Sequence, residues 1–111
     1  MPSVTEIYDE ANRLKEADQL PEAAAKLKEA LALDPDYVLA HSALGVVLQK
    51  LGQHDEAIEH AARACELEPR DSFNFAALSI IYQRAFAGTG NREYIQMAED
   101  AMARSRMIEQ G

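Results

Sequence analysis

The sequence has little that would tie it to an oxidising compartment or to nucleic acid. Cys65 is its only cysteine, which excludes an intrachain disulfide framework. Basic side chains are scarce, because 11 Lys and Arg stand against 19 Asp and Glu and give a formal net charge of -8. Since affinity for a phosphate backbone comes mainly from Lys and Arg, we predict no binding of nucleic acid.

The sequence also lacks the segments that target or anchor a protein to a membrane. No apolar run approaches the roughly 20 residues needed to cross a bilayer, and the start MPSVTEIYDEANRL has no basic region followed by an apolar one. We therefore expect a cytoplasmic protein with no membrane partner. Met1 and the polar ending RSRMIEQG favour a complete chain. Its 111 residues, 48% of them hydrophobic, are enough for one domain with a core of ordinary size.

A period of 34 residues runs through the chain. The segments EAAAKLKEALALDPDY and EAIEHAARACELEPRD superpose at this offset, which places Pro35 on Pro69. A fixed period of this length indicates stacked copies of one structural unit. Apolar residues recur three and four positions apart, as at Leu44, Val47 and Leu51, so each unit divides into helices with one apolar face.

Capping and turn residues mark where these helices begin and end. Ser3 and Glu6 form a capping-box pattern, and Asp36 and Asp71 precede two later helices. Gly52 is suited to the left-handed conformation that ends a helix. We predict six helices and no strands, with the helices near residues 4–17, 21–33, 37–50, 55–67, 72–86 and 92–109.

The pattern resembles the tetratricopeptide repeat family, whose signature is a 34-residue helix-turn-helix unit. The second unit matches best, with Leu44 and Gly45 at the Leu-Gly pair, Gly52 in the turn and Pro69 at the end. In the first unit, Asp18 replaces the turn glycine. The resemblance implies an all-α fold of three tetratricopeptide-like helix-turn-helix repeats, stacked as a short right-handed α-solenoid. It divides the single domain 1–111 into repeats of about 4–37, 38–71 and 72–109.

Seven residues are inserted between the two helices of the third repeat, because the alanine that matches Ala57 stands at Ala98 and not at position 91. We therefore predict an enlarged inter-helix loop over about 86–93, which includes GTGN from Gly88 to Asn91. A glycine-rich loop before a helix is also a candidate anion or nucleotide site. A phosphate-binding loop requires a strand before it and a lysine after it. This loop has neither, which argues against the minor alternative.

The resemblance implies that the first helices of the repeats line a concave groove where a partner binds. The groove positions are Tyr8, Asn12, Lys15, Leu39, Ser42, Val46, Gln49, Lys50, Phe73, Ala76, Ile80, Gln83 and Arg84. Four of these are large and apolar, namely Leu39, Val46, Phe73 and Ile80, and an exposed patch of this kind marks a binding surface. Packing between neighbouring helices is the alternative for each of them.

The apolar groove predicts what kind of segment binds there. Family members that grip a peptide carboxylate use Lys, Arg and Asn, whereas this chain has Val46, Ala76 and Ile80 at such positions. We therefore expect an apolar or amphipathic peptide segment. The groove also has a candidate basic rim that orients an acidic residue of the partner, formed by Lys15, Lys50 and Arg84. The other interpretation is that cations stabilise helix C-termini.

The last helix suggests an alternative function. Three repeats are the minimum expected for stability, so a homodimer through this end or through the groove is physically sensible. Met97, Met102 and Met107 are the candidate dimer contacts, because methionine is common at adaptable surfaces. The chain would then be a self-associating structural scaffold.

Nothing in the sequence favours catalysis. His54 and His60 are six residues apart, which is not the spacing that places two metal ligands on one helix face. His41 stands where the family packs an aromatic residue, so we expect a partly buried structural role. No carboxylate is placed to orient an imidazole beside Ser42. We predict a protein-protein interaction adaptor that is not an enzyme and has no cofactor and no metal.

Overall fold

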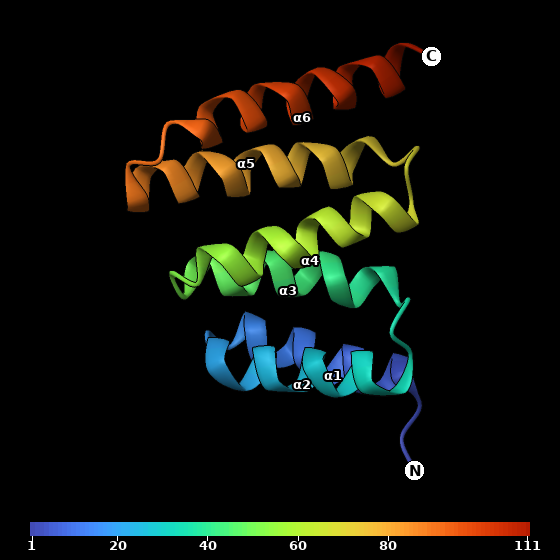
Figure 1. Cartoon of the computed structure of the whole chain (residues 1–111). Coiled ribbons are helices and arrows are strands. Elements are labelled where there is room, and N and C mark those ends of the chain that lie inside the picture. The colour runs from blue at the N-terminus through green and yellow to red at the C-terminus, as the bar shows by residue number, and fades with distance from the viewer.

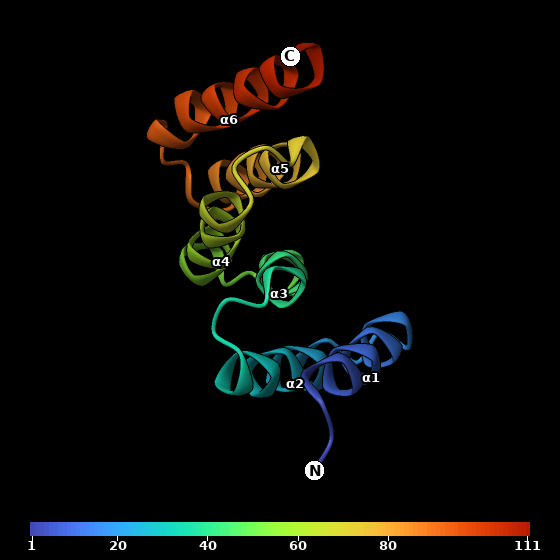
Figure 2. The ribbon, with the colours of Figure 1, turned by 90° about the vertical axis from the view of Figure 1, so that its right-hand side faces the viewer.

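The computed structural model describes all 111 residues, and these form six helices and no strand (Figure 1). The helices are α1 (Val4–Glu16), α2 (Leu20–Leu33), α3 (Val38–Lys50), α4 (His54–Leu67), α5 (Ser72–Thr89) and α6 (Glu93–Gln110). The helices pair into three hairpins, which are α1 with α2, α3 with α4, and α5 with α6. Each hairpin packs on the next. Figure 2 shows α1, α3 and α5 displaced to one side of α2 and α4, with α6 above α5 and the two termini at opposite ends of the stack. The all-α repeat architecture predicted from the sequence is confirmed.

The helix caps agree with the sequence at two of three places. The Ser3 hydroxyl accepts from the Glu6 amide at 3.1 Å, and the Glu6 carboxylate accepts from the Ser3 amide, which completes the capping box. Asp71 accepts from the Phe73 amide at 2.9 Å. The prediction for Asp36 is wrong, because its carboxylate binds Arg63 of α4 at 3.1 Å and leaves α3 without a side-chain cap.

Each hairpin turns through one residue in the left-handed conformation. These residues are Asp18 (φ 60°), Gly52 (φ 78°) and Gly90 (φ 75°). Glycine adopts such angles without steric cost, whereas a residue with a Cβ is strained there. The first turn therefore keeps the geometry of the second although aspartate has replaced glycine.

The enlarged loop expected over 86–93 is wrong in its extent. Helix α5 continues to Thr89, so that only Gly90, Asn91 and Arg92 remain between the last two helices. The Thr89 hydroxyl donates to the Ala85 carbonyl oxygen at 2.7 Å and so supports the final turn of α5. All seven extra residues therefore lengthen the two helices, five at the end of α5 and two at the start of α6, and the turn stays as short as the turn between α3 and α4.

Small residues allow the paired helices to approach closely. A Cβ added to Gly45 of α3 would lie 3.2 Å from the Cβ of Ala61 and 3.3 Å from the carbonyl oxygen of Ala57, both in α4. The equivalent residues in α1 and α5 are Ala11 and Ser79, which are also buried. The Ser79 hydroxyl donates to the Ala98 carbonyl oxygen at 2.7 Å and ties α5 to α6.

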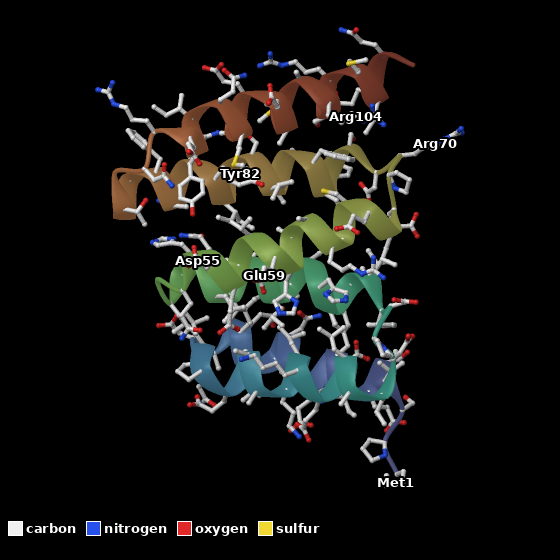
Figure 3. All side chains as sticks on the ribbon, in the orientation of Figure 1. Met1, Asp55, Glu59, Arg70, Tyr82 and Arg104 are labelled. Carbon is white, nitrogen blue, oxygen red and sulfur yellow. The ribbon has the colours of Figure 1, made fainter.

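One continuous hydrophobic core runs through the stack. Its largest fully buried side chains include Leu27 of α2 and Leu44, Val47 and Leu48 of α3. Burying each such leucine contributes about 1.5–3 kcal/mol. The guanidinium of Arg104 in α6 lies 5.8 Å from the centre of the Phe75 ring in α5. Figure 3 shows Arg104 on α6, in the last hairpin of the stack. None of the six helices is long and apolar enough to cross a membrane.

Candidate functional site

The first helices of the three hairpins form one face of the molecule, which we call the first-helix face. Helix α3 contacts both α1 and α5, and Figure 2 shows the three helices on the same side of the stack. Most of the groove positions predicted from the sequence come from α3 and α5, which pack against each other. Side chains on these two helices can therefore form a continuous surface.

Large apolar side chains are exposed on this face. Leu39 of α3 is 53% exposed, and Phe73 and Ile80 of α5 are 83% and 48% exposed. Val46 of α3 is half-buried. Leu39 and Val46 are seven residues apart, as are Phe73 and Ile80, so each pair lies on one side of its helix, two turns apart. We call these four residues the apolar patch.

Two of the predicted polar groove residues already have hydrogen-bond partners within the chain. The Ser42 hydroxyl donates to Asn74 at 2.9 Å, which links α3 to α5. The Gln83 amide donates to the Ser79 hydroxyl at 3.3 Å. A partner that binds Ser42 or Gln83 must share or replace these bonds, so these side chains are less available than their positions indicate.

In the first repeat, Tyr8 packs edge-on against Tyr37, with ring centres 5.7 Å apart. Among the remaining groove positions, Asn12, Gln49 and Ala76 are half-buried.

The basic rim differs from the arrangement that we expected. Lys15 and Lys50 lie in the last turns of α1 and α3. Arg84 does not lie in a last turn, because the extra residues carry α5 five positions beyond it to Thr89. None of the three side chains forms an ion pair, since the ion pairs of the chain involve Lys26, Lys28 and Arg63. The interpretation that Arg84 serves to stabilise a helix C-terminus is therefore wrong.

The GTGN stretch has few free donors for an anion. The Asn91 side chain accepts from the Glu93 amide at 3.1 Å, and the amides of Tyr94 and Ile95 donate to the carbonyl oxygens of Asn91 and Arg92. Gly90 donates to Phe86, at 2.7 Å. An anion site at a helix N-terminus depends on unpaired amides. Here the first amides of α6 are already paired, and the stretch serves as a helix end, a turn and a cap.

His41 has a buried structural role in a contact that the sequence did not reveal. Its Nε2 lies 2.8 Å from the carbonyl oxygen of Pro35, which can only accept, so Nε2 carries the proton. The Nδ1 of neutral His41 then accepts from the Nδ1 of His60, at 3.1 Å. Burial, and secondarily electrostatic repulsion from the neighbouring His41 ring when that ring is charged, lowers the pKa of His60 below its ordinary value of 6.5.

The remaining reactive groups do not converge on a chemical site. No three His, Cys, Asp or Glu side chains are grouped so that they could hold a metal ion. Cys65 is buried, and this burial raises the pKa of its thiol to about 11. A thiol with so high a pKa is a poor nucleophile at neutral pH.

The hairpin stack and its repeated turns define an α-solenoid. Two family models match the chain. The model described as TPR repeat matches residues 11–52, and the model described as tetratricopeptide repeat matches residues 38–71. Together they span more than half of the chain, which belongs to the tetratricopeptide repeat family. No curated protein matches the sequence.

Solved structures of other proteins share this fold. MamA is similar with a TM-score of 0.83 and 24% identity over 97% of this chain and 59% of its own. YrrB, described as a TPR protein with an unusual peptide-binding site, has a TM-score of 0.82 and 23% identity. The match covers 99% of this chain and 53% of YrrB. The second TPR of Spaghetti (RPAP3), solved with the HSP90 peptide SRMEEVD, is similar with a TM-score of 0.81 and 17% identity. The match covers 96% of this chain and 92% of that structure. At these identities the likeness shows the fold alone, and this chain spans little more than half the length of MamA and YrrB.

Proposed function

We propose that this chain is a protein-protein interaction adaptor that binds an apolar or amphipathic segment of its partner on the first-helix face. The observation that carries the proposal is the exposure of Leu39, Phe73 and Ile80 on two helices that pack together. Folding normally buries such side chains, and an exposed apolar patch is typical of a binding surface. The family assignment supports the proposal, because the second TPR of Spaghetti was solved with a bound peptide and YrrB is described as having a peptide-binding site.

Binding works by burial of the apolar side of the partner segment against the apolar patch. Each large side chain that becomes fully covered contributes about 1.5–3 kcal/mol before the costs of association. Lys50 and Arg84 are exposed and free of ion pairs, so they are available to an acidic residue at the edge of the segment. The charges set orientation and association rate more than affinity. No catalytic step is part of this function.

The chain offers a closely matched pair of variants to test this proposal. Leu39 on α3 is 53% exposed, and Leu33 at the end of α2 is 54% exposed. The substitutions Leu39→Asp and Leu33→Asp therefore make the same chemical change at the same exposure, one in the apolar patch and one outside it. Circular dichroism would establish that both variants fold.

The experiment is capture of partners from a lysate of the source cells by the unchanged protein, Leu39→Asp and Leu33→Asp, with identification by mass spectrometry. We expect a partner that binds the unchanged protein and Leu33→Asp but is lost with Leu39→Asp. Ile80→Asp should behave like Leu39→Asp, because both residues belong to the apolar patch. A partner retained equally by all four proteins would show that the first-helix face is not the binding surface.

A further inference from the structure

A cleft of about 650 Å³ lies between α5 and α6, at the C-terminal end of the stack. Gln83 and Phe86 of α5 contribute to one wall. Ile95, Glu99, Met102 and Arg106 of α6 contribute to the other. The cleft is distinct from the apolar patch, because none of the four patch residues lines it.

The repeat explains what shape of ligand this cleft fits. Helix α3 packs on α1 and α2, and α5 packs on α3 and α4, so each of the first two hairpins is covered by the next first helix. In α4, His54 lies against Gly88 of α5, and its equivalent in α6, 41 residues later, is Ile95. Ile95 lines the cleft. The cleft is therefore the place on the third hairpin that a helix occupies on the other two.

The first helix of a second copy is a poor occupant. Leu78 and Ile81 of α5 are buried in the shared core, and 68 residues earlier the equivalents in α1 are Glu10 and Arg13. Both are exposed, and Glu10 pairs with Lys26 at 3.5 Å. Head-to-tail stacking would bury these charges at a cost that desolvation makes large. It would also produce open-ended fibres.

Helix α6 of a second copy is a better occupant. Ile95, Glu99, Met102 and Arg106 are spaced by four, three and four residues, which is the spacing of a seam between two packed helices. Glu99 and Arg106 lie at equal distances along the chain on either side of the midpoint between Met102 and Ala103. If two α6 helices pack antiparallel about a two-fold axis at that midpoint, Glu99 of each copy comes beside Arg106 of the other.

The overall charge does not oppose this contact. From Arg92 to Gln110 the chain has four acidic and three basic side chains, so the net charge of -8 resides almost entirely elsewhere. Ile95 is also exposed at the cleft, which adds apolar area to the contact. Of the three methionines expected at a dimer contact, Met102 lines this cleft, whereas Met97 lies over a different hollow beside Phe75.

We propose that two copies of this chain associate through the cleft, with α6 of each copy packed antiparallel in the cleft of the other. The interface is isologous, because the same residues of both copies form it. Met102 lies at its centre, and the two pairs between Glu99 and Arg106 lie on either side. The inference goes beyond the adaptor function and leaves the apolar patch free to bind a partner.

Charge reversal tests the proposal in a way that a different occupant would not reproduce. Sedimentation equilibrium of the unchanged chain over a concentration series should show a mass twice the 12.3 kDa of one copy. Glu99→Arg or Arg106→Glu alone places like charges together twice in the dimer, and each should raise the dissociation constant by roughly tenfold or more. The double variant with both substitutions should restore the dimer, because the pairs form again with their signs exchanged.

Asp100→Arg is the matched control, since Asp100 is exposed on α6 and lines the hollow with Met97 and not the cleft. It should leave the dimer intact, and circular dichroism should show that every variant folds. A single copy at all concentrations, or single reversals that dimerise as well as the unchanged chain, would overturn the proposal. Failure of the double variant to recover would also overturn it. Saturation of the cleft by a helix from a different protein, with no dimer in its absence, would assign the cleft to that other occupant.

Discussion

Gly45 and Gly88 allow the same substitution at two helix positions with opposite expected results. At Gly45 of α3, an added Cβ would lie 3.2 Å from the Cβ of Ala61 and 3.3 Å from backbone atoms of Ala57 and Ala61 in α4. At Gly88 of α5, the added Cβ would collide only with the imidazole of His54. The first obstacle is another helix, whereas the second is the end of one side chain.

The sign of each effect follows from what can move. Alanine in place of glycine inside a helix stabilises it by about 1 kcal/mol where there is room. The imidazole of His54 can turn toward water, where its buried and unpaired Nδ1 gains a partner, so Gly88→Ala should stabilise the protein by up to about 1 kcal/mol. For Gly45→Ala, overpacking costs about 1–3 kcal/mol and exceeds the gain in helix propensity. We expect a net loss of about 1 kcal/mol.

Urea unfolding followed by circular dichroism measures both changes. In thermal unfolding, each change in stability should shift Tm by about 4 °C for a chain of this length. Tm should rise for Gly88→Ala and fall for Gly45→Ala. Equal stabilisation by both substitutions would refute the reasoning, because it would mean that α3 and α4 can separate at no cost. A loss at Gly88 as large as the loss at Gly45 would show that His54 is fixed in place.

Other parts of the structure lead to further expectations. Asp18→Gly should raise the free energy of unfolding by up to about 1 kcal/mol, since Asp18 has φ 60° and glycine removes the strain, and urea unfolding would measure this. Burial lowers the pKa of His60 below 6.5, so the unfolded chain takes up the proton first and stability should fall as pH drops below that value. Urea titrations across this range should show a weaker dependence in His60→Gln, and an unchanged slope would be evidence against the buried contact. Because the pKa of Cys65 is about 11, only about one thiol in a thousand is ionised at pH 8, and alkylation by iodoacetamide should accelerate only when urea unfolds the chain. Ser3→Ala should lower stability by about 1 kcal/mol through loss of the capping box, whereas an unchanged unfolding midpoint would argue against that cap.

The fold was predictable because several sequence signals agree. The 34-residue period, the apolar spacing and caps such as Ser3 and Asp71 all indicate the same helix boundaries. The extent of the last turn was not predictable, because Gly88 and Gly90 read alike as helix breakers. In the structure Gly90 ends α5 in the left-handed conformation, whereas Gly88 remains helical and its lack of a side chain makes room for His54.

The candidate site was predictable only in part for a related reason. The resemblance to the family places Leu39 and Phe73 on the first-helix face, and this needs no knowledge of the tertiary contacts of this chain. The bond from Ser42 to Asn74 joins residues 32 positions apart, and the contact between His41 and His60 joins residues 19 apart. Such pairings depend on how the helices cross. The cleft at the C-terminal end also depends on how α5 and α6 pack, whereas the shift of Ala98 from the 34-residue register indicates only that α6 matches α4 at an offset of 41.

The most direct test of the central claim is an NMR titration of the labelled chain with the segment of its partner identified by capture. The account predicts that the largest changes fall on the methyl groups of Leu39 and Ile80 and on the ring of Phe73, with little change at Leu33. Saturation of these signals with one segment per copy would show that the first-helix face binds the partner. Changes confined to α6, or to the second helices α2 and α4, with Leu39, Phe73 and Ile80 unaffected, would contradict the account.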